Sequence, residues 1–400
     1  MKYTLYGDGV HDDTAAIQER IDAAECELCL PAPKDCYLIS APLELKSNFR
    51  LVLPRYAKVR LADASNCVML QNKLYKKASY PPQDNLFAYL DIYESDRPAE
   101  NISVIGGIWD CNNLGQLPNP IQSHDYSVEG FWGFGMLFYN VKGLHISNLT
   151  VKDPTNFGIN FDTVSYFTCS DIVFDYNGGN PSRINMDGLH FDGNCHFGTI
   201  RNLQGACYDD LVALNAHEGT LGPISNIQID GIFAEECHSA VRLLAADEDV
   251  TNIHISNVYG TYYQYCIGIT NNYYEDSCKG RYDNITLDHI YASKAVRHPH
   301  LYPNPNSYVY PLIWIDTDLA IEDLTVDKLH RTEYNNPIQT LHLSKGSSIR
   351  RLTVSDSSSK NHTQAPMPFL VNEGCIEKLI LRDCDANGDV LLAGEGTVLQ

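Results

Sequence analysis

The sequence predicts an all-β protein that folds as a single-stranded parallel β-helix, a solenoid in which each coil of chain stacks on the one before. The first observation is a repeat of apolar, strand-like segments. Its key residues are spaced 26, 28, 27 and 26 residues apart, at Ile146, Ile172, Ile200, Ile227 and Ile253. A second series of apolar segments follows at about half that period. A short amphipathic helix precedes both series.

Both series run to the end of the chain in phase with each other. The first comprises residues 143–149, 170–174, 198–203, 225–232, 251–258, 284–287, 323–326, 351–354 and 378–381. The second comprises residues 158–162, 189–192, 212–215, 240–244, 266–270, 312–315, 340–343, 369–371 and 390–392. Apolar and polar residues alternate within these segments, which is typical of strands with one buried face. We therefore expect stacked inward Ile, Leu, Val and Phe side chains to fill one core.

The helix is expected to begin after Asp12 and Asp13. An Asp or Thr cap precedes Ala-rich residues, and Ile17 and Ile21 fall on one face of the helix. This pattern predicts an N-terminal cap over about residues 1–30 that covers the open end of the β-helix.

No Gly/Ser-rich linker divides the chain, so residues 1–400 are expected to form one domain. Two segments interrupt the period, at about 110–135 and 293–308. Long insertions in a regular solenoid usually gather on one face. We expect these two to be loops that wall a groove.

Composition and charge exclude some classes of partner and location. The chain is 44% hydrophobic and 20% charged, as in soluble globular proteins, and no apolar run approaches the ~18 residues that span a membrane. A net charge of −21 argues against nucleic acid or anionic membranes as partners. The first residues lack an apolar signal core, so the chain is expected to be cytoplasmic or to have lost a signal.

The 13 cysteines follow no disulfide framework, which favours reduced thiols and a cytoplasmic location. Cys26 and Cys29 have the spacing of metal ligands, but no second pair completes a zinc site. The sequence therefore predicts neither a metal nor a cofactor.

Carboxylates precede two strands of the second series. Asp187 and Asp210 each lie two residues before an inward residue, Leu189 and Val212. If these strands are stacked neighbours, the two Asp backbones lie about 4.8 Å apart. Asp209 adds a third carboxylate, and crowding raises the pKa of at least one. The alternative is that these residues only form turns, which Asp favours.

An outward column of side chains supports a site. In one register the column runs through Asn160, His190, Ala213, Arg242, Gly268 and Trp314. The small Ala213 leaves room for a sugar ring between His190 and Arg242. Arg242 is expected to bind a substrate carboxylate or sulfate, to tune the aspartates, or to form a surface ion pair. His217 is a further candidate for substrate binding. Tyrosines such as Tyr265, which lie just beyond the candidate strands, are also candidates because flat aromatic rings suit sugar surfaces.

The opening segment from Gly7 to Gln18 resembles the N-terminal signature of pectate-lyase-like right-handed β-helix proteins, notably the polygalacturonases of glycoside hydrolase family 28. The family's Asn-x-Asp-Gly motif is matched from Asn185 to Gly188, and its Asp-Asp motif by Asp209 and Asp210. Its Gly-His-Gly motif is half matched around His238. Its Arg-x-Lys motif, which grips the galacturonate carboxylate, would fall near residues 267–270 and is absent.

This resemblance implies a right-handed β-helix and a glycoside hydrolase that inverts configuration without a metal. It implies Asp187, Asp209 and Asp210 as catalytic residues, with the choice between acid and base left open. The residues expected to bind substrate are Asn160, Asn185, His190, His217, His238 and Arg242. The expected partner is an oligosaccharide or polysaccharide, and a homo-oligomer is compatible with the sequence.

Two alternatives use the same scaffold. One is a polysaccharide lyase, epimerase or glycan transferase; such lyases commonly use calcium and a basic residue, for which His190 or Arg242 would serve. The other is a solenoid that binds glycans without catalysis. Binding that survives Asp187→Asn and Asp210→Asn, with no product from the wild type, would indicate the second.

Overall fold

A computed structural model describes residues 1–73, 97–117, 133–177, 185–271, 279–296 and 310–400. The fold class predicted from the sequence is confirmed: strands in parallel register form a β-helix with one short N-terminal helix. The described chain divides into two compact units. The first comprises Met1–Gly198, Cys207–Asp209 and Glu218–Thr220, and the second Thr199–Ala206, Asp210–His217 and Leu221–Gln400. The single domain stays a prediction.

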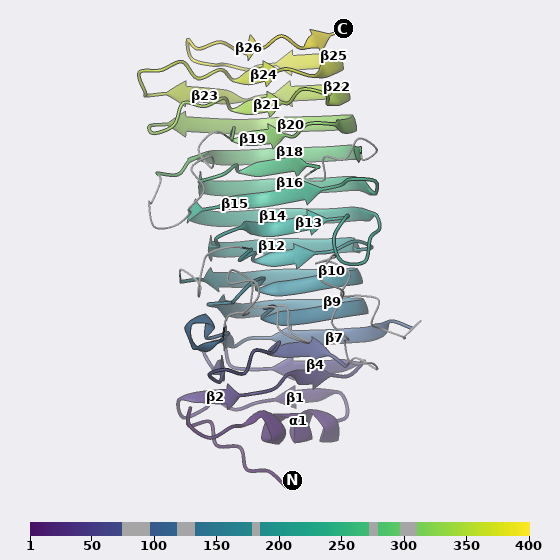
Figure 1. The fold of residues 1–400 in the computed structure, drawn as a ribbon, viewed down its shortest axis with the longest axis vertical. Helices are drawn as coiled ribbons and strands as arrows, with labels where there is room; N and C mark the ends of the chain where they lie inside the picture. The colour runs from purple at the N-terminus through teal and green to yellow at the C-terminus, as the bar shows by residue number, and fades with distance from the viewer. Residues whose placement is uncertain (74–96, 118–132, 178–184, 272–278, 297–309) are drawn as a thin grey trace. The chain divides into compact units, whose positions relative to one another are not determined.

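Helix α1, Thr14–Ala23, lies at the N-terminal end of the first unit beside β1 (Figure 1). Its Ala16, Ile17 and Ile21 are buried, as the amphipathic pattern predicted. The cap differs in detail from the expectation. Asp12 Oδ1 accepts the backbone N–H of Thr14 at 2.8 Å, whereas Asp13 makes no capping hydrogen bond to the helix. Asp13 instead accepts the N–H groups of residues 6 and 7 and so holds the N-terminal segment against the helix.

Strands of the first unit form three columns that converge on one long strand. The first column is β1 (Glu27–Cys29), β4 (Phe49–Val52) and β7 (Ala99–Ile105); the second is β2 (Cys36–Ile39), β5 (Lys58–Leu61) and β8 (Ile108–Asp110); the third is β3 (Leu43–Leu45) and β6 (Leu70–Asn72). All three pair with β9, Met136–Lys152, which pairs with β10, Ile159–Asp175. Strand β10 then pairs with β11, Leu189–Phe191. Inward rings stack along this column, with Phe161 and Phe191 centroids 4.3 Å apart.

Strands of the second unit form two columns. One is β13 (Asp210–Asn215), β15 (Ser239–Leu244), β17 (Ile267–Thr270), β19 (Ile313–Ile315), β21 (Leu341–Leu343), β24 (Leu370–Asn372) and β26 (Leu392–Ala393). The other is β14 (Ile224–Cys237), β16 (Asp249–Tyr262), β18 (Gly280–Lys294), β20 (Leu319–Glu333), β22 (Ser348–Ser355), β25 (Cys375–Arg382) and β27 (Thr397–Val398). Strand β23, Ser358–Asn361, pairs with the end of β20. Strand β12, His196–Ala206, is divided between the two units.

The predicted register holds in the second unit. Ile227 pairs with Ile253, and the same row continues through Ile285, Leu324 and Leu352. These side chains are inward, and burial of one face fixes the register of a strand.

In the first unit, Ile146 and Ile172 keep the interval of the repeat but do not pair with each other. Ile146 pairs with Cys169, and Ile172 pairs with Leu149. The cause is a left-handed residue, Asn148 with φ 58°, which bends β9 between two inward side chains. The inward residues on both sides of the bend, Ile146 and Leu149, match the apolar repeat. The repeat alone therefore does not show which of them pairs with Ile172.

Asparagines mark the corresponding bends in the second unit. Asn226, Asn252 and Asn284 have φ values of 58°, 55° and 53°. Asn is tolerated in this region because its short amide can bond locally. The three side chains form a ladder: Asn252 Nδ2 donates to Asn226 Oδ1 at 3.1 Å, and Asn284 Nδ2 donates to Asn252 Oδ1 at 2.9 Å. The repeated Asn-Ile pair in the sequence therefore records a turn followed by an inward residue.

The remaining expectations are tested only in part. Most of the two insertions, at 110–135 and 293–308, lies outside the described residues, which include a short 3-10 helix at Asn113–Gly115. Each cysteine that the structure describes is a free thiol, and Cys26 and Cys29 are exposed. Among the described residues no helix is long and apolar enough to cross a membrane.

Candidate functional site

The residues predicted for a site are divided between the two units. Asn160, Asn185, Asp187, His190 and Asp209 belong to the first unit, and Asp210, His217, His238 and Arg242 to the second. The expected proximity of Asp187 to Asp210 therefore stays a prediction. Within each unit, the structure brings several of these residues together.

The cluster in the first unit is centred on His190, in the middle of β11. Its Nδ1 lies 2.6 Å from Oδ2 of Asp187, three residues earlier in the chain. Its Nε2 faces two further carboxylates, with Glu218 Oε2 at 3.1 Å and Asp192 Oδ1 at 3.3 Å. All four side chains are buried, with His190 only 2% exposed. The outward position predicted for His190 is therefore covered rather than open to solvent.

Neighbours hold this cluster in place. The ring of Phe157 stacks on the imidazole, with centroids 3.9 Å apart and planes at 7°. Asn160 pairs in register with His190, as the outward column predicted, and its Nδ2 donates to Asp192 Oδ2 at 2.9 Å. These contacts fix the ring plane of His190 and direct Oδ1 of Asp192 toward Nε2.

A glycine lets the turn that carries Glu218 lie close to the side chains of Asp192 and Asp162. Gly219 has φ 59°, and a Cβ there would lie 2.3 Å from Asp192 Cγ and 2.4 Å from Asp162 Oδ2. Only glycine fits at such a position. The next residue, Thr220, donates its backbone N–H to Asp162 at 2.8 Å.

Burial and mutual repulsion set the charges. Burial, together with the nearby Asp192 carboxylate, raises the pKa of Asp162 well above its usual value. For His190, burial alone would lower the pKa, but the carboxylates of Asp187, Asp192 and Glu218 around the ring outweigh burial and raise the pKa well above its usual value. The cluster therefore concentrates negative charge around one imidazole.

Three members of this cluster were missed from the sequence: Asp162, Asp192 and Glu218. Asp192 lies in the same outward alternation as His190, which was a usable signal. Glu218 comes from a turn after the next strand, and nothing in the local sequence marks its approach. His190, Asp192 and Glu218 together can hold a metal ion, since their ligand atoms all lie within 4.8 Å of one another.

The cluster in the second unit is centred on Asp210, the first residue of β13, which is 1% exposed. Ser239 donates its hydroxyl to Asp210 Oδ1, and the hydroxyl of Tyr265 lies 3.3 Å from the same oxygen. The other oxygen, Oδ2, is 3.8 Å from a guanidinium nitrogen of Arg242. Strand pairing positions these groups, because Asp210 pairs with Ser239 and the next rung brings Tyr265.

His238 lies beside this carboxylate and is also buried. Its Nδ1 is 3.4 Å from the hydroxyl oxygen of Ser239. Burial lowers the pKa of His238 to about 4, although the charge of Asp210 opposes that shift. The imidazole is therefore neutral at pH 7.

Aromatic rings line the outward column beyond Arg242. The column Ala213, Arg242, Gly268 and Trp314 is in the predicted register. Gly268 makes room for Tyr265, since a Cβ there would lie 2.6 Å from its ring. The rings of Tyr310 and Trp314 lie 4.5 Å apart, and Tyr265 lies 5.6 Å from Trp314. Arg242 is 17% exposed, and its Nε donates to Thr270 at 3.1 Å.

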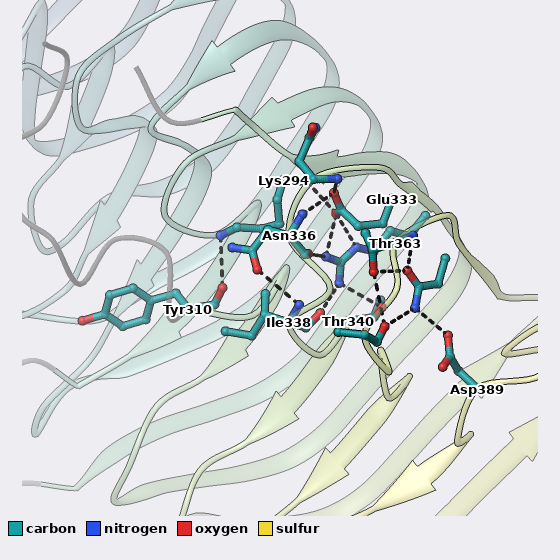
Figure 2. Close-up of polar contacts among 12 residues, drawn as sticks. Lys294, Tyr310, Glu333, Asn336, Ile338, Thr340, Thr363 and Asp389 are labelled. Carbon is teal, nitrogen blue, oxygen red and sulfur yellow. Dashed lines mark hydrogen bonds and ion pairs between the residues drawn. The ribbon is translucent and has the colours of Figure 1, made fainter. Parts of the chain in front are cut away.

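A buried lysine, Lys294, holds the backbone of two of these tyrosines, and Figure 2 shows its contact with Tyr310. Lys294 Nζ donates to the backbone carbonyls of Gln264 and Tyr310, the latter at 3.0 Å. Gln264 directly precedes Tyr265, so one amine positions both tyrosines. Burial and the charge of Arg331 lower the pKa of Lys294 to about 7, against the opposing charge of Glu333.

The structure also describes His217 and Asn185. His217 Nδ1 lies 2.6 Å from Glu248 Oε2, and both side chains are partly exposed. Asn185 is exposed with φ 52°, as expected of a turn residue. Tyr273 and Tyr274 lie outside the described residues.

No family model and no curated protein matches the sequence. Solved structures match it in fold. The surface adhesin PfbA of Streptococcus pneumoniae gives a TM-score of 0.60 at 16% identity, covering 96% of this chain and 91% of the adhesin. An exopolygalacturonase from Thermotoga maritima gives 0.58 at 14% identity, covering 94% and 89%. The A-module of mannuronan C-5 epimerase AlgE4 from Azotobacter vinelandii gives 0.50 at 11% identity, covering 99% and 98%.

At these identities the likeness shows the fold alone. The chain has a right-handed parallel β-helix fold, as predicted. The three neighbours are an adhesin, a hydrolase and an epimerase, so the fold does not choose among those functions.

Proposed function

We propose that this chain is a carbohydrate-active glycoside hydrolase in which Asp210 takes part in proton transfer at the glycosidic bond. The observation that carries the proposal is the setting of Asp210. Its carboxylate is buried, oriented by two hydroxyls and faced by Arg242, next to a group of aromatic rings. An oriented carboxylate beside flat rings suits the binding and cleavage of a sugar chain.

Hydrolysis with inversion requires two carboxyl groups. One protonates the oxygen of the leaving sugar, and the other takes a proton from the water that attacks the anomeric carbon. We assign Asp210 to one of these tasks and Asp187 or Asp209 to the other, following the resemblance to family 28. This mechanism needs no metal ion at the reacting atoms.

Arg242 and the aromatic rings would bind the substrate. The guanidinium suits a carboxylate or sulfate on the sugar, and Trp314 and Tyr310 offer flat apolar surfaces. The family's Arg-x-Lys pair is absent, because Gly268 occupies that part of the column. The proposed substrate is therefore an oligosaccharide or polysaccharide that is recognised by one arginine.

A lyase or epimerase is a second candidate, and His238 favours it. Its imidazole is buried beside Asp210 and Ser239, where it would serve as the base that removes the proton next to a uronate carboxylate, the first step of both reactions. In the lyase, the electron pair of the broken C–H bond forms a C=C bond as the glycosidic oxygen leaves.

Incubation of the chain with a panel of oligosaccharides tests these proposals. New reducing ends without the ultraviolet absorbance of an unsaturated uronide indicate hydrolysis, and that absorbance indicates elimination. Asp210→Asn should lower hydrolytic turnover at least ~100-fold, the usual effect of losing an acid–base group. The control is Asp249→Asn, which removes an exposed carboxylate paired with Arg281.

Circular dichroism should show an unchanged fold in both variants. Wild-type turnover in Asp210→Asn would remove Asp210 from the mechanism. Sugar binding without any product from the wild type would overturn the hydrolase and support a non-catalytic solenoid.

A further inference from the structure

The imidazole of His190 presents a buried nitrogen that has no hydrogen-bond partner. The other ring nitrogen, Nδ1, is engaged by Asp187, whereas Nε2 is inaccessible to solvent and lacks a partner of hydrogen-bond geometry. It points at the carboxylates of Asp192 and Glu218. A buried polar atom without a partner is costly, so a group that satisfies Nε2 would stabilise the site.

The spacing of these atoms matches the coordination sphere of a small divalent ion. Ligand atoms about 2.0–2.2 Å from a tetrahedral or octahedral metal lie about 3.0–3.5 Å from one another. His190 Nε2 is 3.1 Å from Glu218 Oε2 and 3.3 Å from Asp192 Oδ1. All three ligand atoms lie within 4.8 Å of one another, so a movement of the two carboxylates around Nε2 would place an ion at bonding distance from all three.

We propose that His190, Asp192 and Glu218 bind a divalent transition-metal ion such as Zn²⁺ in the first unit. One nitrogen and two carboxylate oxygens are ordinary zinc ligands, and the remaining position would take water. Imidazole selects such an ion over Ca²⁺, which prefers oxygen ligands. The ion would also offset two buried carboxylate charges, which are expensive to bury uncompensated.

The residues around the three ligands are those a metal site needs. A histidine that binds metal usually donates its other N–H to a carboxylate, which fixes the tautomer and the ring orientation. Asp187 occupies that place on Nδ1. Asn160 donates to Oδ2 of Asp192 and leaves Oδ1 facing Nε2 of His190. Phe157 covers one face of the imidazole.

The competing explanation is an imidazolium surrounded by carboxylates, with a proton in place of the ion. A site that holds a metal ion and one that holds a proton differ in metal content, so measuring the metal bound per chain separates the two explanations. Metal binding is measured without substrate and does not depend on the proposed hydrolysis.

The first experiment strips the purified full chain with a chelator and dialyses it against Zn²⁺, Mn²⁺ or Ca²⁺. Elemental analysis should find about one Zn²⁺ per chain, and the melting temperature should rise with Zn²⁺ but not with Ca²⁺. Co²⁺ in the same site should give visible absorption bands. No retained transition metal with an unchanged melting temperature, or stabilisation by Ca²⁺ alone, would overturn the proposal.

Variants then locate the ion. Glu218→Gln and Asp192→Asn each remove a ligand charge and should lower Zn²⁺ affinity at least 10-fold. Asp187→Asn removes no ligand atom but weakens the support of His190, and should lower Zn²⁺ affinity about 10–100-fold. The control Asp175→Asn removes an exposed carboxylate of the same unit, paired with Lys152, and should bind like the wild type. Wild-type affinity in a folded Glu218→Gln protein would place the ion elsewhere and refute the assignment.

Discussion

Ser239 donates its hydroxyl to Oδ1 of Asp210 from the neighbouring rung of the second unit, and both side chains are buried. The two residues are partners in the strand register, so the hydrogen bond follows from how the coils pair. Together with the hydroxyl of Tyr265, it fixes which oxygen of the carboxylate faces Arg242. The orientation of the proposed acid–base group is thus set by uncharged neighbours.

Removing that donor should therefore cost stability. Ser239→Ala should lower the free energy of unfolding by about 1.5–3 kcal/mol, the usual range for a hydrogen bond to a charged group. Chemical denaturation measures the change. Ser348→Ala, at a half-buried serine of β22, is the control and should change stability by less than about 0.5 kcal/mol. Equal effects of the two substitutions would show that the bond to Asp210 contributes nothing to stability.

The aromatic group makes a prediction about sugar binding. Trp314→Ala should weaken binding of a substrate oligosaccharide by about 1–2 kcal/mol, close to tenfold, because a flat apolar surface is lost. Trp314→Phe keeps a ring but loses the hydrogen bond from Nε1 to Ser344, and should stay within about threefold of the wild type. Isothermal titration calorimetry measures both affinities.

The matched control lies in another stack of rings in the second unit. Phe233, Tyr259 and Tyr291 stack with centroids 5.2 and 5.1 Å apart, and all three are exposed. Tyr259→Ala removes a ring from this stack and should leave oligosaccharide affinity unchanged. If it weakened binding as much as Trp314→Ala, sugar recognition would be a general property of surface rings rather than of the proposed site.

The sequence was sufficient for the fold because the coils repeat. Inward residues such as Ile227 and Ile253 recur at a constant interval, and each must face the same core. Ile146 and Ile172 keep this interval without being partners, because the bend at Asn148 has an inward residue on either side and two registers fit the pattern equally well. Periodicity thus predicts the architecture, but turn geometry decides the register.

The candidate sites were predictable only where their residues share a local pattern. Asp187 and His190 are three residues apart, and the strand that follows shows that His190 faces outward. Ser239 and Glu218 reach their partners from other coils, and neither has a sequence signal of its own. Contacts between coils depend on side-chain orientation and on close approaches such as that of Gly219, which a strand pattern does not encode.

Lys294 makes a prediction about pH. Its pKa is lowered to about 7 in the folded chain by burial and by Arg331, against an unfolded value of about 10.4. Between these values the unfolded chain binds a proton that the folded chain does not, so stability should rise with pH from 7 toward 10. The slope from this group is at most about 1.4 kcal/mol per pH unit.

Substituting the lysine isolates that contribution. Lys294→Met should remove this group's contribution to the rise of the free energy of unfolding with pH. Lys378→Met, at an exposed lysine of β25, should keep that rise. Urea denaturation at several pH values between 7 and 10 gives the comparison. The same slope in Lys294→Met as in the wild type would mean that the amine keeps its proton in the folded state.

The ion pair beside Lys294 predicts a large loss of stability. Arg331 donates to Oε2 of Glu333 from Nε at 3.0 Å and from a terminal nitrogen at 2.6 Å, and both side chains are fully buried. The other oxygen of Glu333 accepts the backbone N–H groups of Asn335 and Asn336 at 2.9 and 3.0 Å. Glu333→Gln leaves the buried guanidinium uncompensated and should cost about 3–5 kcal/mol.

An exposed pair in the same unit is the control for this loss. Glu322 Oε2 lies 2.7 Å from Nε of Arg350, at a similar distance but in contact with solvent. Glu322→Gln should cost at most about 1 kcal/mol, because water screens the pair and solvates the arginine left behind. Denaturation of both variants under the same conditions measures the difference. A Glu333→Gln protein no less stable than Glu322→Gln would mean that water or a rearranged neighbour reaches Arg331, and that burial does not determine the strength of this pair.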